Sequence, residues 1–136
     1  MKYSDALELA ESFTKKYPFL ILSGSVALIL EGELHEREVG DIDFVVNSKD
    51  LSSEIFDEEI EDIMDCEEYM DTDEESCDLV SNYKSDCGTY NILVYRDSTP
   101  IFCQKENCID MRIQIPQQIW HYKKKMKRKK DNLDLL

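Results

Sequence analysis

The sequence lacks any apolar run of about 18 residues, the length that a helix needs to cross a bilayer, so we expect no membrane span. Its first residues are polar and helical in pattern, without a basic stub before an apolar block. We therefore expect no secretory signal and a cytoplasmic protein. No internal repeat is visible, and 136 residues predict one domain, 1–136, without room for a second catalytic domain.

Cysteines are present in an odd number and at irregular spacing, which argues against a disulfide framework. The five are Cys66, Cys77, Cys87, Cys103 and Cys108. This pattern favours free thiols in a reducing compartment. No CxxC pair or nearby histidine accompanies Cys103 and Cys108, so we do not expect a zinc site there.

Basic residues are scarce outside the C-terminal region. The net charge is −14, and seven of the 16 basic residues fall between Lys123 and Lys130, which leaves residues 1–122 with nine basic and 28 acidic side chains. Such an acidic body repels nucleic acid over most of its surface. A phosphate-bearing ligand must therefore be met by the basic C-terminal helix, by a metal ion, or by both.

Hydrophobic periodicity predicts helices that alternate with a few strands. We expect helices at 4–16, 25–34, 52–66 and 116–131, strands at 18–24, 41–47, 89–96 and 109–115, and an irregular acidic loop or insertion at 66–88. The segment 52–88 is then an acidic helix and loop, and Pro116 opens a basic last helix. This order predicts an α/β (α+β) domain, with a small mixed sheet covered by helices mainly on one face.

Two aspartates interrupt a segment that otherwise has the composition of a buried strand. Asp41 and Asp43 are two residues apart in DIDFVVN, so both side chains should lie on one face of the strand, with Ile42 and Phe44 on the other. Two close carboxylates repel each other unless a cation lies between them. Mg²⁺, or Mn²⁺ in its place, suits them because it prefers oxygen ligands and commonly binds carboxylates together with substrate phosphates.

A Gly-Ser turn lies upstream of these aspartates. Ser23, Gly24 and Ser25 lead into a predicted helix, whose free N–H groups and dipole favour phosphate. Alternatively, Ser25 serves only as the helix N-cap. A phosphate site and a carboxylate pair within one strand-turn-helix-strand unit indicate nucleotide transfer. We expect Asp41 and Asp43 to converge beside the turn, in a cleft that solvent reaches.

The stretch GSVALILEGELHEREVGDIDFVV resembles the signature of the nucleotidyltransferase superfamily, the DNA polymerase beta-like fold. It is most similar to the small stand-alone members of prokaryotes and their viruses, phage included, and to those of toxin–antitoxin systems. The C-terminal IQIPQQIWHYKKKMKRKKDNLDLL supports the resemblance, and the two stretches cover roughly half the chain.

The resemblance implies a minimal nucleotidyltransferase-like fold and a role for each matching residue. Gly24 and Ser25 would hold the triphosphate of an NTP such as ATP, and Asp41 and Asp43 would bind Mg²⁺. Lys123 would contact phosphate from the last helix.

Other basic residues have two interpretations. Arg37, just before the aspartates, could reach the same phosphates or could pair with Glu36 or Glu38 at the surface. The lysine run from Lys123 is either a solvated helix face or a contact for phosphate or nucleic acid.

The family pattern also has a third carboxylate on a later strand, which shares a metal and helps to activate the attacking hydroxyl. In this sequence the strand at 89–96 should supply it, and the matching residue is Asn91. An asparagine can bind a metal through its carbonyl oxygen, but it carries no charge and cannot take a proton. Asp110, in the strand at 109–115, is an alternative third ligand.

Two classes of function stay open. One is an enzyme that moves a nucleoside monophosphate from an NTP to a hydroxyl of RNA, protein or a small molecule. The other is a catalytically degenerate, regulatory or defence-related toxin–antitoxin module, which binds a protein partner through its acidic face at 54–78 or its basic helix. The second class gains if Asn91 lies beside Asp41 and Asp43 and no other acid does.

Overall fold

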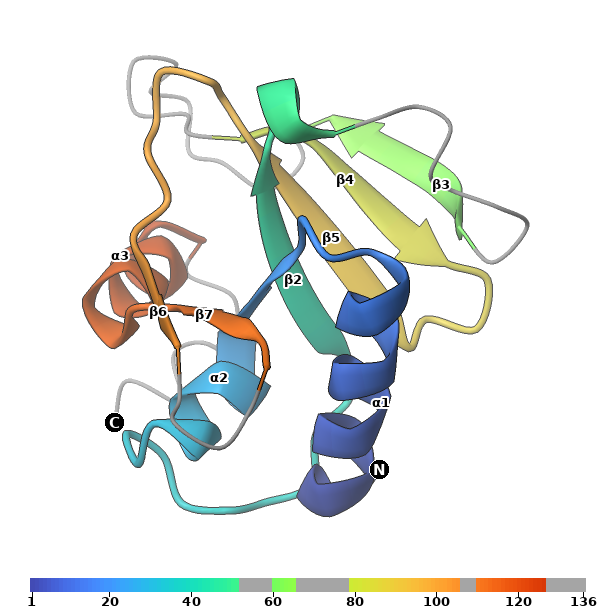
Figure 1. Cartoon of the computed structure of the whole chain (residues 1–136), viewed down its shortest axis with the longest axis vertical. Helices are drawn as coiled ribbons and strands as arrows, with labels where there is room; N and C mark the ends of the chain where they lie inside the picture. Colours follow the sequence, from blue (N-terminus) through green and yellow to red (C-terminus); the bar gives the residue numbers. More distant parts are fainter. Residues whose placement is uncertain (52–59, 66–78, 106–109, 127–136) are drawn as a thin grey trace.

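The computed structural model describes residues 1–51, 60–65, 79–105 and 110–126. Over these ranges the chain forms a mixed α/β domain with seven strands in one sheet (Figure 1), which confirms the predicted fold class. The helices are α1 (Tyr3–Lys16), α2 (Gly24–Leu30), the 3₁₀ turn η1 (Ser48–Asp50) and α3 (Pro116–Met126). The strands are β1 (Ile21–Ser23), β2 (Ile42–Asn47), β3 (Ile60–Asp65), β4 (Leu79–Ser85), β5 (Tyr90–Tyr95), β6 (Cys103–Lys105) and β7 (Arg112–Gln114).

The sheet has the strand order β3-β4-β5-β2-β1-β7-β6 and mixes both pairing directions. β2 lies at its centre, parallel to β5 and antiparallel to β1, and β1 in turn runs parallel to β7. The expected neighbourhood of the strands at 41–47 and 89–96 is therefore confirmed. Their register places Asp43 directly opposite Asn91.

The main hydrophobic core lies between the sheet and the two helices α1 and α2, which cover one of its faces (Figure 1). α1 turns Ala6, Ala10 and Phe13 toward this core, at the spacing of one helical face. The Phe13 ring lies 5.2 Å from that of Phe44 and 4.0 Å from that of Tyr90, measured between centroids. These aromatic contacts join α1 to the two central strands.

The opposite face of the sheet carries a second cluster, built from Ile21, Val45, Leu79, Leu93 and Tyr95 and joined by Tyr122 of α3. Side chains alternate along β2, so Ile42, Phe44 and Val46 enter the main core while Val45 enters the second cluster. Asp43 shares the face of Val45. The structure thus confirms that Asp43 lies on the opposite face of the strand from Ile42 and Phe44.

Two local predictions are wrong where the structure describes the chain. The helix expected at 52–66 is strand β3 over Ile60–Asp65, and the loop expected at 66–88 is strand β4 over Leu79–Ser85. The apolar spacing of Ile60, Ile63 and Met64 fits a helix. In the structure, however, this segment forms backbone hydrogen bonds with the edge of β4. Sheet pairing of this kind overrides local periodicity. Residues 52–59 and 66–78 lie outside the described residues, and 86–88 form the turn between β4 and β5, as a loop prediction requires.

Other boundaries shift by smaller amounts. α2 ends at Leu30, earlier than the predicted 34, because Gly32 follows with φ of 79°, in the left-handed region that ends helices. β6 pairs with β7 and was not predicted. α3 begins at Pro116 as expected, and residues 127–131 of the predicted helix lie outside the described residues.

Cys87 and Cys103 are exposed free thiols, as expected for two of the five cysteines, and the other three lie outside the described residues. A side-chain hydrogen bond with Thr89 lowers the pKa of the Cys87 thiol. Within the described ranges, no helix has the length and apolarity that a bilayer crossing requires.

The aromatic contact between α1 and β2 predicts a large effect of truncation. Phe44→Ala should lower the free energy of unfolding by about 3–5 kcal/mol, because Phe44 is fully buried and its loss leaves a cavity. Phe102→Ala is the matched control, since Phe102 is 54% exposed, and it should change the value by no more than about 0.5 kcal/mol. Urea denaturation measures both, and equal losses would contradict a core centred on β2.

Candidate functional site

Three polar residues form a row across the middle of the sheet. Ser23 at the end of β1 lies opposite Asp43 on β2, which lies opposite Asn91 on β5. Residues paired in this way across neighbouring strands point to the same face. Ser23, Asp43 and Asn91 are 5%, 7% and 5% exposed. We call these three residues the polar row.

The carboxylate of Asp43 lies directly against the backbone of Gly24. Gly24 has φ of 64°, and a Cβ placed on it would lie 2.8 Å from Asp43 Cβ and 2.9 Å from Asp43 Cγ and would collide with Oδ2. A residue other than glycine therefore cannot take this position without displacing the carboxylate. The structure thus joins Gly24 and Asp43, two residues that the sequence marked separately.

Asn91 completes the row from the other side. Its Nδ2 donates to Asp43 Oδ1 at 3.0 Å within buried surroundings. Its own Oδ1 is buried, and no hydrogen-bond donor in the described part of the chain reaches it. A buried carbonyl oxygen without a donor is costly, so this atom suits a water molecule, a ligand or a cation.

Ser25 and Arg37 extend the site beyond the row. Arg37 Nη2 donates to Ser25 Oγ at 3.0 Å, so the arginine reaches the Gly-Ser turn as expected. The loop that carries Arg37 is fastened by the N-terminal amine, which donates to the carbonyl of Val39 at 2.9 Å. Ser25 Oγ accepts from Arg37 and can still donate its own hydrogen to a ligand.

The N-cap interpretation of Ser25 is wrong, because Ser23 occupies the N-cap position of α2. The Ser23 hydroxyl does not cap the helix but donates to Gln114 Oε1 at 2.6 Å. Gln114 is fully buried and donates through Nε2 to the Tyr95 hydroxyl and to Gln118 Oε1, at 3.3 and 2.8 Å. This network ties the end of β1 to β7 and α3 and thereby fixes the turn that presents Gly24.

A hollow of about 220 Å³ lies beside Arg37, where the N-terminus meets the loop after α2. Tyr3 and Glu36 both line it, and Glu38 lies next to Arg37 in the chain. Burial, together with the negative charge of Glu36, raises the pKa of the Tyr3 hydroxyl. The hollow therefore carries the positive charge of Arg37 and the negative charges of Glu36 and Glu38.

Asp41 and Asp43 differ in burial. Asp43 is buried within β2, whereas Asp41 is half-buried and directly precedes the strand. Solvent therefore has more access to Asp41 than to Asp43, and the open cleft expected for both carboxylates is not present at Asp43.

Two of the predicted residues, Lys123 and Asp110, remain to be placed. Lys123 is 3% exposed, on the helix α3 that contacts α2. Asp110 lies before β7, separated from β2 by β1, and forms an exposed ion pair with Lys105 at 3.8 Å. Asp110 is thus outside the polar row, and the alternative that it substitutes for Asn91 is wrong.

The donor set determines what the site can hold. In the described ranges, no group of three or more His, Cys, Asp or Glu residues gathers around a common point. The polar row offers the Asp43 carboxylate and the buried Asn91 Oδ1 as oxygen ligands. Asp41, two residues before Asp43 and next to the start of β2, is the candidate for a second carboxylate. Oxygen donors alone, two of them charged, suit Mg²⁺ or Mn²⁺ rather than a softer metal.

The fold and the polar row define a mixed α/β domain with a buried carboxylate beside a Gly-Ser turn. No family model and no curated protein matches the chain. The crystal structure of JHP933 from Helicobacter pylori is similar, with a TM-score of 0.46 and 18% identity over 89% of this chain and 55% of that chain. The present chain therefore spans about half the length of that protein.

The contact between Gly24 and Asp43 predicts a difference between two glycine substitutions. Gly24→Ala and Gly32→Ala both place an alanine at positive φ, which costs about 1–2 kcal/mol. Only Gly24→Ala also drives a methyl group into Asp43, which should add about 1–3 kcal/mol. Urea denaturation compares the two, and an equal loss of stability would show that Asp43 does not constrain Gly24.

Proposed function

We propose that the protein is a metal-dependent nucleotidyltransferase, which moves a nucleoside monophosphate from an NTP to a hydroxyl of RNA, protein or a small molecule. The observation that carries this is the packing of the Asp43 carboxylate against Gly24, with Ser25 and Arg37 hydrogen-bonded beside them. It combines, at one turn, a place for a cation and a place for phosphate. We place the protein in the cytoplasm, where NTPs are available and exposed thiols stay reduced.

Ser25 and Arg37 would hold the triphosphate. The Ser25 hydroxyl can donate to a phosphate oxygen, and the guanidinium of Arg37 can exchange its contact with Ser25 for charge-assisted bonds to phosphate. α2 has only seven residues, about two turns, so its dipole contributes less than these two side chains. Lys123 would contact the same phosphates from α3, which packs against α2.

Asp41, Asp43 and Asn91 Oδ1 would hold Mg²⁺ or Mn²⁺, which when bound neutralises phosphate charge. Asp43 is kept in place by Gly24 on one side and by the Asn91 amide on the other. Asn91 cannot accept the proton that the attacking hydroxyl loses, because an amide is not a base at neutral pH. Proton removal is therefore left to Asp41, Asp43 or water.

One observation favours a second function. Asn91 directs a hydrogen-bond donor at Asp43, where the family pattern has a carboxylate, and no other described acid takes its place. A site of this kind would bind an NTP without transferring it. The protein would then be a regulatory module of a toxin–antitoxin or defence system, which binds a protein partner through its acidic face or basic helix.

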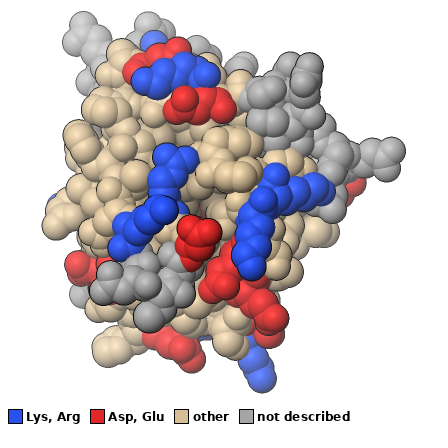
Figure 2. All heavy atoms as spheres, viewed as in Figure 1, with Lys and Arg blue, Asp and Glu red and all other residues tan. Residues whose placement is uncertain are grey.

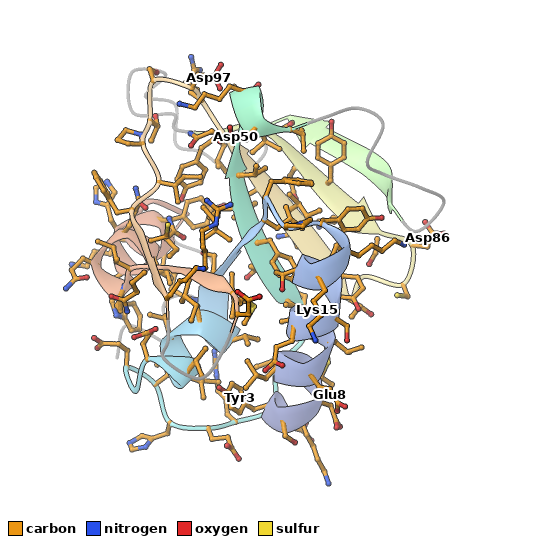
Figure 3. The ribbon with its side chains drawn as sticks, in the orientation of Figure 1. Tyr3, Glu8, Lys15, Asp50, Asp86 and Asp97 are labelled. Atoms are coloured by element: carbon orange, nitrogen blue, oxygen red, sulfur yellow. The ribbon has the colours of Figure 1, made fainter. Side chains whose placement is uncertain are left out.

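Transfer of label from radioactive NTPs to candidate RNA and protein acceptors, with Mg²⁺ or Mn²⁺, tests the enzyme directly. Asp43→Asn and Asp41→Asn should each lower the rate about a hundredfold or more, because each removes a charge that stabilises the transferring phosphoryl group. Asp50→Asn is the matched control, since exposed Asp50 lies on η1 beyond the far end of β2 (Figure 3). It should leave the rate unchanged.

The outcomes separate the two functions. NTP binding by calorimetry without transfer to any acceptor would contradict the enzyme and support the binding module. No binding of any of the four NTPs, with either metal, would overturn both.

The buried amide of Asn91 predicts a metal-dependent change in stability. Asn91→Asp replaces a donor to Asp43 with a second carboxylate, which should lower stability by about 1–3 kcal/mol without a divalent cation. Mg²⁺ should restore part of the loss, because it binds the folded protein between the two charges. Thermal unfolding with EDTA and with Mg²⁺ measures the difference.

Asn47→Asp supplies the control for this experiment. Asn47 is also buried on β2, but its Nδ2 donates to the carbonyls of Arg96 and Thr99, at 3.1 and 2.8 Å. The Asn47→Asp variant should be destabilised, and Mg²⁺ should not rescue it. Equal responses of the two variants to Mg²⁺ would contradict a cation site at the polar row.

A further inference from the structure

A second hollow, of about 360 Å³, lies at the other end of β1 from Gly24. Its rim carries Lys15 from α1, Lys105 from β6 and Arg112 from β7, together with Asp110. Leu20 and Met111, both buried, line it as well. Leu20 and Gly24 are four residues apart along an extended segment, or roughly 13 Å, so this basic hollow is separate from the polar row.

The grouping of basic residues here is unusual for so acidic a protein. The chain has a net charge of −14, and three of its 16 basic residues line this one hollow. Lys105 and Arg112 lie directly opposite each other in the antiparallel pair β6–β7, and the fold brings Lys15 of α1 to the same hollow. Figure 2 shows basic side chains over α1 and over β7 on this face, and Figure 3 places Lys15 on α1.

Arg112 is held in a fixed orientation. Its Nη2 donates to the carbonyls of Phe19 and Pro18, at 2.9 and 3.4 Å. A guanidinium has five N–H groups, and none of those on Nε and Nη1 is used by an acceptor in the described part of the chain. A guanidinium fixed through one nitrogen is preorganised to bind an oxyanion through its others.

The two lysines add charge, and in the described part of the chain neither has a strong competing partner. Lys105 contacts Asp110 at 3.8 Å, and their side chains are 66% and 93% exposed, so this ion pair is weak. Lys15 is exposed in the last turn of α1. An anion held by Arg112 would meet both ammonium groups. Asp110 would disfavour a ligand with a second anionic group at its end of the hollow and can accept hydrogen bonds from a hydroxyl or amino group.

We propose that this basic hollow binds a small phosphomonoester with a planar or apolar part, of the chemical class of a nucleoside monophosphate. Arg112, Lys15 and Lys105 contact the phosphate, the exposed ring of Pro18 contacts the apolar part, and Asp110 accepts a hydrogen bond from the ligand. The volume suits one small ligand. The site works independently of the nucleotidyltransferase function proposed for the polar row.

Titration of the protein with AMP, inorganic phosphate and adenosine, in EDTA and low salt, tests the site by calorimetry and by amide chemical shifts. AMP should bind more tightly than phosphate, and adenosine should not bind. Lys15→Gln combined with Lys105→Gln should weaken AMP binding at least tenfold. Both lysines are exposed, so the double variant should keep its fold, as its melting temperature would verify.

Two further variants serve as controls. Lys124→Gln and Lys49→Gln each remove one exposed lysine outside the hollow, from α3 and from η1. Both should bind AMP as the unmodified protein does. The inference is overturned if AMP shows no saturable binding up to about 10 mM. Equal affinity for AMP and phosphate, or an unchanged affinity in the double variant, would overturn it too.

Discussion

The Asp43 carboxylate lies buried between the α-carbon of Gly24 and the side-chain amide of Asn91, and the arrangement of the central strands depends on this contact. Burial of a carboxylate is costly unless hydrogen bonds or a cation compensate it. The glycine permits the close approach, and the register of β2 and β5 supplies the amide. The network from Ser23 through Gln114 holds the turn in place. Asp43 therefore has a structural role, in the packing of the central strands, and is also the carboxylate of the candidate site.

The parts of the fold that the sequence predicts are those whose pattern is local. α1 and α3 have clear helical faces, and β2 and β5 are rich in β-branched and aromatic residues, so their existence follows from period and composition. β3 and β4 are not predicted by local pattern, because the spacing of Ile60, Ile63 and Met64 favours a helix. They form strands because β4 pairs with the edge of β5 and β3 pairs with β4. Gly88, with φ of 75° in the turn between β4 and β5, was the available signal that a strand precedes β5.

The candidate site divides in the same way. Asp43, Gly24 and Ser25 could be marked because they are close in sequence and unusual in type, and Asn91 because its strand resembles one that supplies a carboxylate. The contact of Ser23 with Gln114 joins residues 91 positions apart, and no local pattern announces it. Asp110 was a plausible ligand only until the strand order put β1 between it and Asp43. Both results depend on which distant strands pair, and this pairing cannot be predicted from a single sequence.

The two functions proposed above, nucleotide transfer and nucleotide binding without transfer, both require a nucleotide at the Gly-Ser turn. The most direct test is a titration of the ¹⁵N-labelled protein with ATP, first in EDTA and then with Mg²⁺. Saturable shifts of the amide signals of Gly24, Ser25 and Asp43 that require Mg²⁺ are the expected result. Unchanged signals at these residues with Mg²⁺ and ATP at saturating concentrations would contradict a nucleotide site at the polar row.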